Sequence, residues 1–493
     1  MERSLVGVDV GTTGTKAILI SENGREVSHA YIGYPTYTPD TFMCEQDADE
    51  LWNAVADTVR RVSDGVEDKE AIVGISLSTQ GGTLIATDGK FDPVYRAIVW
   101  SDKSCDPERA LFIKESGVSQ EELHRKTGWN LSHGLPLLQI RRLHDRMRPV
   151  YDKSAYFLSV PDFVSARMTG IPAVDLSNAG INELTDIRKR EYDPSLCAFA
   201  RVRTPQLGQL TESGTPIGRL TPEAAKRMGL TESTVLAAGA HDQYAVALGA
   251  GLTEEGDILI GSGTSWVVTA IGDQPDFGSG LSQSVPAVPG KWGSLLSLSY
   301  GGACLEWLRK NVMAAPDGSV MELRDIDEKC RQARAAEDGL FFYPFSGKLS
   351  DGLPESTTRA VFLGLDVSHD KYDMALAVME GVAFQIKWMC ESFREISENG
   401  IRLTGGAAKS ALWTQIIADV LGKPVRLSRI PDMACIGAAV MAGVGAGVYA
   451  TAEEGVKRMA QRESAVYPDP RKAERYREAF ETYKKRAAAL ASL

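Results

Sequence analysis

The sequence is poor in the residues that build disulfides and metal clusters. Its seven cysteines are dispersed over 493 residues without a Cys-x-x-Cys pair, and its six histidines show no metal-ligand spacing. This pattern argues against a disulfide framework and against a zinc site, and it is typical of buried thiols in a reducing cytosol. We therefore expect a cytoplasmic protein.

Long apolar runs and an excess of basic residues are also missing. No apolar run approaches the ~20 residues of a membrane span, and we expect no signal peptide before the first strand. The formal net charge is −11, whereas nucleic-acid phosphates select basic surfaces. We expect neither membrane nor nucleic acid as a partner. The hydrophobic content of 43% and the length suit a globular protein of two large domains.

A Gly-Thr-rich turn between two apolar runs is the most informative segment. Residues 5–10 lead into Gly11-Thr12-Thr13-Gly14-Thr15, and Lys16 begins the second run. The glycines permit a tight turn whose N–H groups, with the hydroxyls and the ammonium, suit a phosphate. Asp9, at the end of the first run, is a candidate Mg²⁺ ligand. We interpret the segment as a phosphate-binding hairpin, with an ordinary Gly-Thr-rich hairpin as the alternative.

The spacing around this turn excludes two better-known phosphate loops. A P-loop needs four residues between its first glycine and its Gly-Lys-Ser/Thr, which the segment from Gly11 to Lys16 does not supply. The dinucleotide fingerprint needs a helix after its glycines. Here Asn23-Gly24 predicts another hairpin turn, and residues 25–32 a third strand. The order is strand, turn, strand, turn, strand, with no helix between.

A second hairpin in the other half of the chain repeats this plan. An apolar run from residue 257 meets a Gly/Ser/Thr turn containing Gly263 and Thr264, and a second apolar run continues to residue 270. Two such hairpins predict two similar domains, 1–248 and 249–493, each contributing a phosphate loop to one cleft. Two domains around a nucleotide also provide a hinge that closes the site and excludes water.

Periodicity and turn signals predict the remaining elements. We expect helices at 47–62, 411–421, 436–443 and 471–493, strands at 71–77 and 294–298, and a largely helical, loop-rich region at 105–230. The turn Gly405-Gly406 precedes one of these helices, where small residues let a base or a phosphate approach the backbone. A simple tight turn is the alternative there.

A carboxylate follows a small-residue strand just before the second hairpin. Phosphoryl transfer to an alcohol needs positioning, charge neutralisation and one carboxylate to accept the hydroxyl proton. Asp242 is the candidate base, and a helix cap is the alternative for it. Its neighbour His241 could contact the substrate or only pack, and Gln243 is a candidate partner for a hydroxyl.

Four blocks in order, at 7–16, 100–102, 239–251 and 405–421, resemble the FGGY carbohydrate kinases of the actin, sugar-kinase and heat-shock ATPase superfamily. The resemblance runs from Val6 to Tyr449. It implies an α/β fold with two ribonuclease H-like (actin-like) domains and a nucleotide cleft between them. It also implies ATP and Mg²⁺ as cofactors and a xylulokinase-like activity on a small-molecule sugar. A homodimer is left open.

The resemblance assigns roles by position. Asp242 matches the catalytic base, and Asp9 and Asp242 are the carboxylates linked to the metal. The ATP-binding positions are Thr12, Thr13, Gly14, Lys16, Gly263, Thr264, Gly302, Glu306, Gly405, Gly406 and Ser410. The substrate-binding positions are Gln80, Gly81, Gly82, Trp100, Asp102, His241 and Gln243.

The departures from the family pattern concern the sugar. Xylulose kinases follow the glutamine that matches Gln80 with Met-His, and glycerol kinases with Arg-Glu, whereas Gly81 and Gly82 follow here. We therefore expect a roomier acceptor pocket and no glycerol kinase activity. The pair His241-Asp242 resembles the fuculose and rhamnulose kinases of the family more than it resembles the xylulose kinases.

The leading hypothesis is phosphorylation of a terminal hydroxyl of a ketose, either a pentulose or a hexulose, or of a related polyol. One alternative is a non-catalytic regulatory member that binds sugar or nucleotide, which has no need of both Asp9 and Asp242. The other is an actin- or chaperone-like ATPase, which gives no reason for the insert at 105–230. An ATP assay with and without a sugar panel separates the three.

Overall fold

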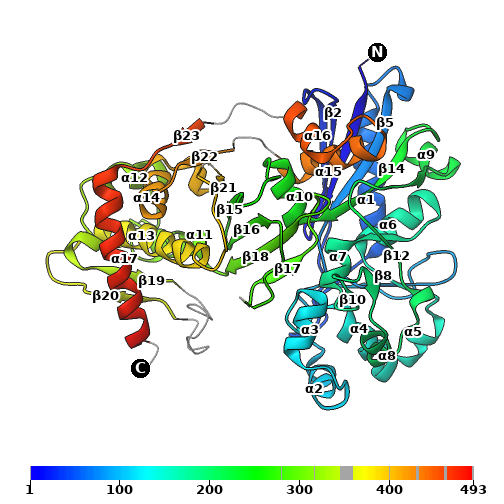
Figure 1. The fold of residues 1–493 in the computed structure, drawn as a ribbon, viewed down its shortest axis with the longest axis horizontal. Coiled ribbons are helices and arrows are strands. Elements are labelled where there is room, and N and C mark those ends of the chain that lie inside the picture. Colours follow the sequence, from blue (N-terminus) through cyan, green and yellow to red (C-terminus); the bar gives the residue numbers. More distant parts are fainter. Residues whose placement is uncertain are drawn as a thin grey trace.

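The computed structural model describes residues 2–278, 280–315, 317–344, 359–398, 400–428, 432–459 and 464–490. Two mixed β-sheets flanked by helices form its two halves, the first on the right of Figure 1 and the second to its left. The order of the first sheet is β13 (Pro216–Arg219), β14 (Val235–His241), β5 (Ile72–Thr79), β1 (Ser4–Val10), β2 (Gly14–Ser21) and β3 (Glu26–Gly33). The order of the second is β17 (Ser282–Ser284), β18 (Trp292–Leu298), β16 (Trp266–Gly272), β15 (Ile258–Ser262), β21 (Ile401–Gly405), β22 (Val425–Leu427) and β23 (Ser464–Val466).

The two sheets repeat one pattern of pairing. In the first, β1 is antiparallel to its hairpin partner β2 and parallel to β5, which is parallel to β14. In the second, β15 is antiparallel to β16 and parallel to β21, which is parallel to β22. The chain therefore builds the same arrangement twice, as the two similar hairpins predict.

Helix α1 (Ala48–Ser63) covers one face of the first sheet because its sequence has a start signal and an apolar stripe. The Asp47 carboxylate accepts hydrogen bonds from the N–H groups of Asp49 (2.9 Å) and Glu50 (3.1 Å), which caps the helix. Leu51, Val55 and other residues of the stripe are buried in the same core as strands β1 and β5. The helix predicted at 47–62 is confirmed.

Two helices from distant parts of the sequence cover the opposite face. Helices α10 (Asp242–Gly249) and α15 (Met433–Gly445) share a buried core with β1 and β2, and α16 (Ala452–Met459) packs beside them. Residues 433–459 therefore pack with the first sheet, although they lie within the second predicted domain, 249–493. The boundary at 248/249 stays a prediction.

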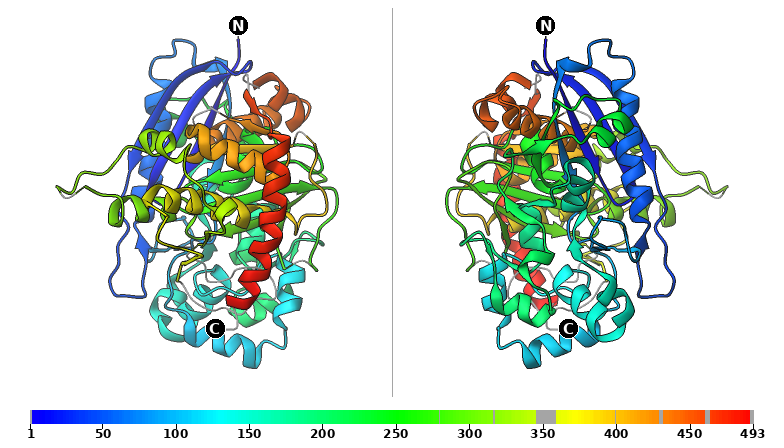
Figure 2. Two further views of the ribbon diagram at one scale, coloured as in Figure 1. Left: turned by 90° about the vertical axis from the view of Figure 1, so that its left-hand side faces the viewer. Right: turned by 90° about the vertical axis from the view of Figure 1, so that its right-hand side faces the viewer.

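The second sheet is covered by helices α11 (Gly301–Asn311), α12 (Leu323–Cys330), α13 (Lys371–Cys390), α14 (Ala411–Leu421) and α17 (Pro470–Leu490). Helix α17 crosses this group on the outside, as the left view of Figure 2 shows. It is anchored by Phe480 and Tyr483, and the Tyr483 ring stacks on Tyr343 with centroids 4.4 Å apart. The expected tail helix is present, and residues 491–493 of that expectation lie outside the described residues.

The region at 105–230 is mostly helical and loop-rich, as expected. Its helices are α2 (Asp106–Glu115), α3 (Gln120–Thr127), α4 (Pro136–Arg146), α5 (Arg148–Lys153), α6 (Val160–Thr169), α7 (Leu176–Ile181), α8 (Pro194–Ala200) and α9 (Pro222–Met228). The remaining short strands are β4 (Glu45–Gln46), β6 (Ile85–Thr87), β7 (Ala97–Ile98), β8 (Tyr156–Leu158), β9 (Ala173–Asp175), β10 (Thr185–Asp186), β11 (Glu191–Tyr192), β12 (Gln209–Thr211), β19 (Phe341–Tyr343) and β20 (Val361–Leu363). Among the described helices, none combines the length and the apolar character that a bilayer crossing requires.

Candidate active site

Two tyrosine hydroxyls donate hydrogen bonds to carbonyls of the turn between β1 and β2. The Gly11 N–H donates to the Gly14 carbonyl across the turn (3.0 Å). The Tyr34 hydroxyl donates to the Gly11 carbonyl (2.5 Å), and the Tyr31 hydroxyl to the Thr13 carbonyl (3.2 Å). The N–H groups of Thr12 and Thr13 donate to no group within the described residues. Fixed carbonyls and unused N–H groups are the arrangement that a phosphate requires.

Asp9 lies at the end of β1, directly opposite Lys16 on β2 and beside Ser78 on β5. Its Oδ1 accepts a hydrogen bond from the Ser78 hydroxyl at 2.7 Å. Burial raises the pKa of Asp9 to about 6; the Ser78 hydrogen bond and the Lys16 charge lower it, and the charges of Asp242 and Asp432 raise it further. Asp9 is therefore a half-buried carboxylate whose negative charge is only partly compensated.

Lys16 has a partner that the sequence interpretation missed. Its ammonium forms an ion pair with Asp432, which directly precedes α15. The charges of Asp242 and Asp432 both act on Asp9, and Lys16 is the cation among the groups that act on it. An excess of carboxylates over cations suits a divalent ion, and a pair such as Asp9 and Asp242 suits Mg²⁺ in particular.

The side chains around Asp9 suit a metal ion that takes some of its ligands from the substrate. Within the described ranges, no three His, Cys, Asp or Glu side chains form a ready metal cluster. Mg²⁺ usually keeps several waters and binds one or two carboxylates together with substrate phosphates. The residues around Asp9 fit that mode of binding.

Asp242 is the first residue of α10, where β14 ends. Its side chain makes no capping hydrogen bond to the helix, so the helix-cap alternative does not describe it. His241 Nε2 lies 3.2 Å from Asp242 Oδ1, but this oxygen has no hydrogen-bond partner among the described residues. The side chain is one-third exposed. A half-buried carboxylate with an unused oxygen is available to accept a proton.

His241 packs into the space beside Gly81, which corrects the expected roomy pocket. A Cβ at Gly81 would lie 2.7 Å from His241 Cδ2, and a Cβ at Gly82 would lie 2.5 Å from Leu135 Cδ2. The His241 ring also meets the edge of Trp129, with centroids 6.1 Å apart. The two glycines therefore accommodate neighbouring side chains and leave no extra room. His241 packs against these neighbours, and its contact with the substrate stays a prediction.

A hydrogen-bond network joins the first phosphate turn to predicted sugar-site residues. The Thr12 hydroxyl donates to Gln80 Oε1 (3.1 Å) and accepts from Trp100 Nε1 (3.1 Å). Gln46, which the sequence interpretation missed, accepts from Gln80 Nε2 (3.0 Å) and donates to the Thr12 carbonyl (2.6 Å). Nothing in the sequence near Gln46 signals this role, since it stands in a two-residue strand. Gln243, also predicted, is half-buried in the first turn of α10.

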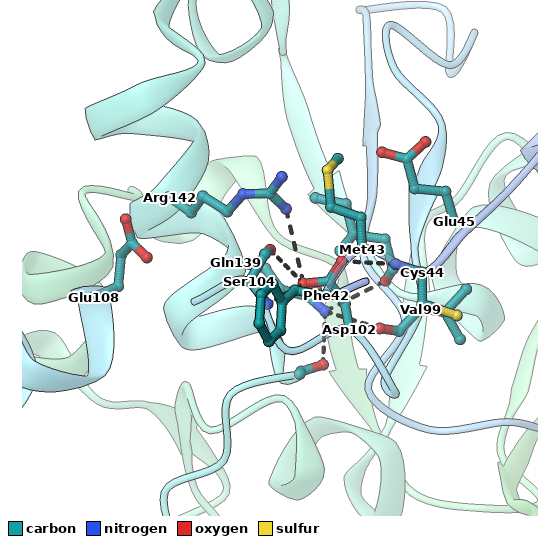
Figure 3. Close-up of polar contacts among 12 residues, drawn as sticks. Phe42, Met43, Cys44, Glu45, Val99, Asp102, Ser104, Glu108, Gln139 and Arg142 are labelled. Atoms are coloured by element: carbon teal, nitrogen blue, oxygen red, sulfur yellow. Dashed lines mark hydrogen bonds and ion pairs between the residues drawn. The ribbon is translucent and has the colours of Figure 1, made fainter. Parts of the chain in front are cut away.

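Asp102 is held by the segments around it. Its side chain is fully buried, and Oδ2 accepts from the Cys44 N–H at 2.9 Å (Figure 3). Oδ1 accepts from the Ser104 N–H at 2.9 Å and lies 3.9 Å from Arg142 Nη1. Both oxygens therefore help to fix the loop after Trp100, and the contact of Asp102 with the sugar stays a prediction.

The predicted adenosine-side residues come together around the second hairpin. The Gly406 N–H donates to the Ser262 carbonyl (2.7 Å), and the Ala303 N–H to the Thr264 carbonyl (3.2 Å). A Cβ at Gly302 would lie 2.3 Å from the Gly263 carbonyl oxygen. The second turn, the start of α11 and the turn after β21, which contains Gly405, are therefore in direct contact.

Two further predicted ATP contacts have partners of their own. Ser410 caps α14 by accepting from the Trp413 N–H (2.9 Å), and its hydroxyl donates to Asp327 Oδ2 (2.7 Å). Glu306 forms ion pairs with Arg309 (2.8 Å) and Lys310 (3.0 Å), and the Arg309 hydrogen bond lowers its pKa. Both sit beside the second hairpin region, and their contact with adenosine stays a prediction.

Comparison with known proteins gives a consistent result. The model of the FGGY family of carbohydrate kinases matches through its N-terminal domain at residues 4–249 and through its C-terminal domain at residues 258–446. A gluconokinase from Bacillus subtilis is 28% identical over 92% of this chain and 88% of its own length. A xylulose kinase from the same organism is 26% identical over 97% of this chain and 96% of its own length.

The solved structure of a ligand-bound xylulose kinase from Lactobacillus acidophilus superposes with a TM-score of 0.89 at 24% identity, covering 99% of this chain and 98% of that one. The α/β fold with two ribonuclease H-like (actin-like) domains is thereby confirmed.

Proposed function

Since the chain belongs to the FGGY family of carbohydrate kinases, we propose that it transfers the terminal phosphoryl group of ATP to a terminal hydroxyl of a neutral ketose or related polyol. The observation that carries this proposal is the Asp242 carboxylate. It begins a helix without capping it, keeps one oxygen unused, and acts electrostatically on Asp9 beside the first phosphate turn.

Each group has a separate task in this reaction. Asp242 accepts the proton of the attacking hydroxyl, because this transfer otherwise needs little covalent chemistry from the protein. The N–H groups of Thr12 and Thr13 orient phosphate oxygens, and the second hairpin with Gly263 and Thr264 holds the nucleotide from the other half. Mg²⁺, bound at Asp9, would neutralise charge on the phosphates.

The charges near the base favour a neutral acceptor over an aldonate such as gluconate. Among the predicted substrate positions, Asp102 has a basic neighbour, and that residue, Arg142, lies 3.9 Å from it and is itself buried. Within the described part of the chain, no Lys or Arg side chain forms a hydrogen bond or ion pair with Gln80, Trp100 or His241. Without a nearby cation, charge repulsion and desolvation would disfavour binding of a substrate carboxylate beside Asp242. Both a gluconokinase and xylulose kinases are among the relatives. The charges near Asp242 favour a neutral acceptor such as a ketose over gluconate.

An ADP-release assay with an acceptor panel tests the proposal. The panel contains pentuloses, hexuloses, polyols, glycerol and gluconate, and each reaction is run with and without Mg²⁺. We expect ADP release that depends on a ketose or polyol and is weak with gluconate. Release independent of any acceptor would identify an ATPase, and nucleotide or sugar binding without turnover would identify a regulatory protein. Either result would overturn the proposal.

A further inference from the structure

A groove of 1080 Å³ lies among the helices of the second sheet and plays no part in the proposed reaction. Its walls come from the end of α12 and the following loop, one face of α13, the first turns of α14 and the outer helix α17. Figure 1 shows these helices together at the left-hand end of the molecule, on the side away from α10. The volume is slightly above the usual range of small-molecule sites, so a small ligand would occupy part of the groove.

Basic side chains line the groove from two segments, the end of α12 with its following loop and helix α17. They are Arg331, Arg334, Lys472, Arg475 and Arg486. Three of these are engaged: Arg334 pairs with Asp338 (2.9 Å), Arg475 pairs with Glu337, and Arg486 donates to the Gly339 carbonyl (2.9 Å). Arg331 and Lys472 form no ion pair with any described residue. Two cations thus face the groove with unused donors.

Three of the four acidic side chains that line the groove are engaged by described residues. Asp419 accepts from Gln415 Nε2 (2.8 Å) and from the Asp469 N–H (2.7 Å). Glu380 accepts from the Tyr476 hydroxyl (2.8 Å) and the Ala336 N–H (3.0 Å). The remaining acidic side chains are Glu337, paired with Arg475, and Glu478 at the rim.

Glu380, like Asp419, is deeply buried, and its carboxyl is readily neutralised. It is 4% exposed, and burial raises its pKa to about 7, with the Tyr476 and Ala336 hydrogen bonds and the Lys472 charge opposing the rise and the Glu337 charge adding to it. Near neutral pH, the floor of the groove therefore carries less negative charge than its carboxylates suggest. Free guanidinium and ammonium donors above such a floor suit an anion.

The groove also shares two helices with the predicted adenosine site. Helix α14 begins at the cap residue Ser410, and its Ala411 and Leu412 line the groove. Helix α12 carries Asp327, which is hydrogen-bonded to Ser410, and Arg331 follows one turn later. A ligand that moves either helix changes the position of the Ser410–Asp327 pair.

We propose that this groove is a regulatory site for a phosphate monoester of a small organic molecule, held by Arg331 and Lys472 and coupled through α12 and α14 to nucleotide binding. The coupling rests on the proposed function, because it takes Ser410 as an adenosine contact. The binding does not, since an anion can occupy the groove whether or not the protein is a kinase. Coupling between two sites is reciprocal, so nucleotide must change the affinity of the groove by the same factor.

Calorimetric titration of the full chain with phenyl phosphate tests the binding, and phenol is the neutral control. Saturating Mg-ADP is present, so that the phosphate hairpins are occupied. We expect saturable binding of phenyl phosphate and none of phenol. The double substitution R331Q/K472Q should weaken it about tenfold or more, since two charge-assisted contacts are lost. Lys485→Gln, on the exposed side of α17, should leave it unchanged.

The same titrations separate failure of this inference from failure of the kinase proposal. Absence of saturable binding, or equal binding by wild type and the double variant, would overturn the site. For the coupling, saturating phenyl phosphate should change the affinity for ADP about threefold or more in the wild type and not in the double variant. An unchanged ADP affinity in the wild type would overturn the regulatory part. The kinase proposal fails only in the acceptor assay.

Discussion

The two hairpins have the same backbone plan and opposite chemical character. Across the first, Asp9 faces Lys16, and Ser78 lies beside Asp9 on the parallel strand. Across the second, Gly261 faces Val267, and Thr404 takes the place of Ser78. The position that carries a half-buried carboxylate in one half therefore carries no side chain in the other.

This difference separates two tasks within a duplicated scaffold. The first half has Asp9 at one strand end and Asp242 after another, so carboxylates meet where a phosphoryl group would move. The second half presents the turn of Gly263 and Thr264, packed against α11 through Gly302. We infer that the first half supplies catalytic and metal-binding charge, whereas the second holds the nucleotide through backbone and hydroxyl groups.

The largest effect is expected when the proposed base, Asp242, is removed from the first half. Asp242→Asn keeps the size of the side chain and abolishes its ability to take a proton, so turnover should fall by about 10²–10⁴-fold. ATP affinity, measured by calorimetry, should change little, because the nucleotide is held elsewhere. Turnover close to that of the wild type would mean that Asp242 is not the base, and the inferred division of tasks between the two halves would be wrong.

The second prediction neutralises Asp9. Asp9→Asn should lower Mg²⁺-dependent turnover by about 10–100-fold, the usual cost of disturbing a metal site. It should also stabilise the fold at pH 7.5. The folded-state pKa of about 6 lies above that of an unfolded aspartate. The native state therefore binds more protons between about pH 4 and 6, and stability falls as the pH rises through this window. Above it, the charged carboxylate costs about 3 kcal/mol, which asparagine avoids.

Thermal unfolding at pH 4 and pH 7.5 checks this sign. The variant should melt higher than the wild type at pH 7.5. The difference should shrink at pH 4, where folded Asp9 is protonated and the unfolded aspartate is about half protonated. Asp64→Asn, at a carboxylate that is 62% exposed, is the control and should show no such pH dependence. If the variant melted lower than the wild type at pH 7.5, the surrounding protein groups would compensate the negative charge of Asp9, and the predicted cost of that charge would be wrong.

Local pattern was enough to predict most of the scaffold. Both hairpins, α1, α14 and the tail helix follow from alternation, caps and turn residues that act within a few positions of one another. Asp242 was identified by its place between a strand and the second hairpin. In each case the signal and the structure it specifies lie in the same short segment.

The contacts that were missed join segments far apart in the chain. Lys16 pairs with Asp432, Gln46 bridges Thr12 and Gln80, and His241 fills the space beside Gly81. None of these partners has a local signature, because each is selected by tertiary packing. Asp102 illustrates the same limit: the Trp-x-Asp pattern locates the loop, but the burial of its carboxylate beside Arg142 depends on helix α4, which comes from a later segment of the chain.

A third prediction disturbs the second half alone. Gly302→Ala places a methyl group 2.3 Å from the Gly263 carbonyl oxygen, so the second turn must shift away from α11. We expect the KM for ATP to rise about tenfold, since a displaced turn loses hydrogen bonds to the nucleotide. The preference among acceptors should stay the same. Gly89→Ala, where a Cβ meets nothing within 4 Å, is the matched control.

The smallest effect is expected at the Thr264 hydroxyl, and it tests the comparison most finely. Thr264 is exposed on the second turn, and its carbonyl already accepts from the Ala303 N–H, so substitution of the side chain leaves the turn in place. Thr264→Ala should raise the KM for ATP by about 2–10-fold, the worth of one hydrogen bond, and Thr264→Ser should restore it. Neither variant should alter kcat by much or change which sugar is used. If Thr264→Ala lowered kcat as strongly as Asp242→Asn while the KM for ATP stayed constant, the second hairpin would share in the chemistry, and the division of tasks between the two halves would be wrong.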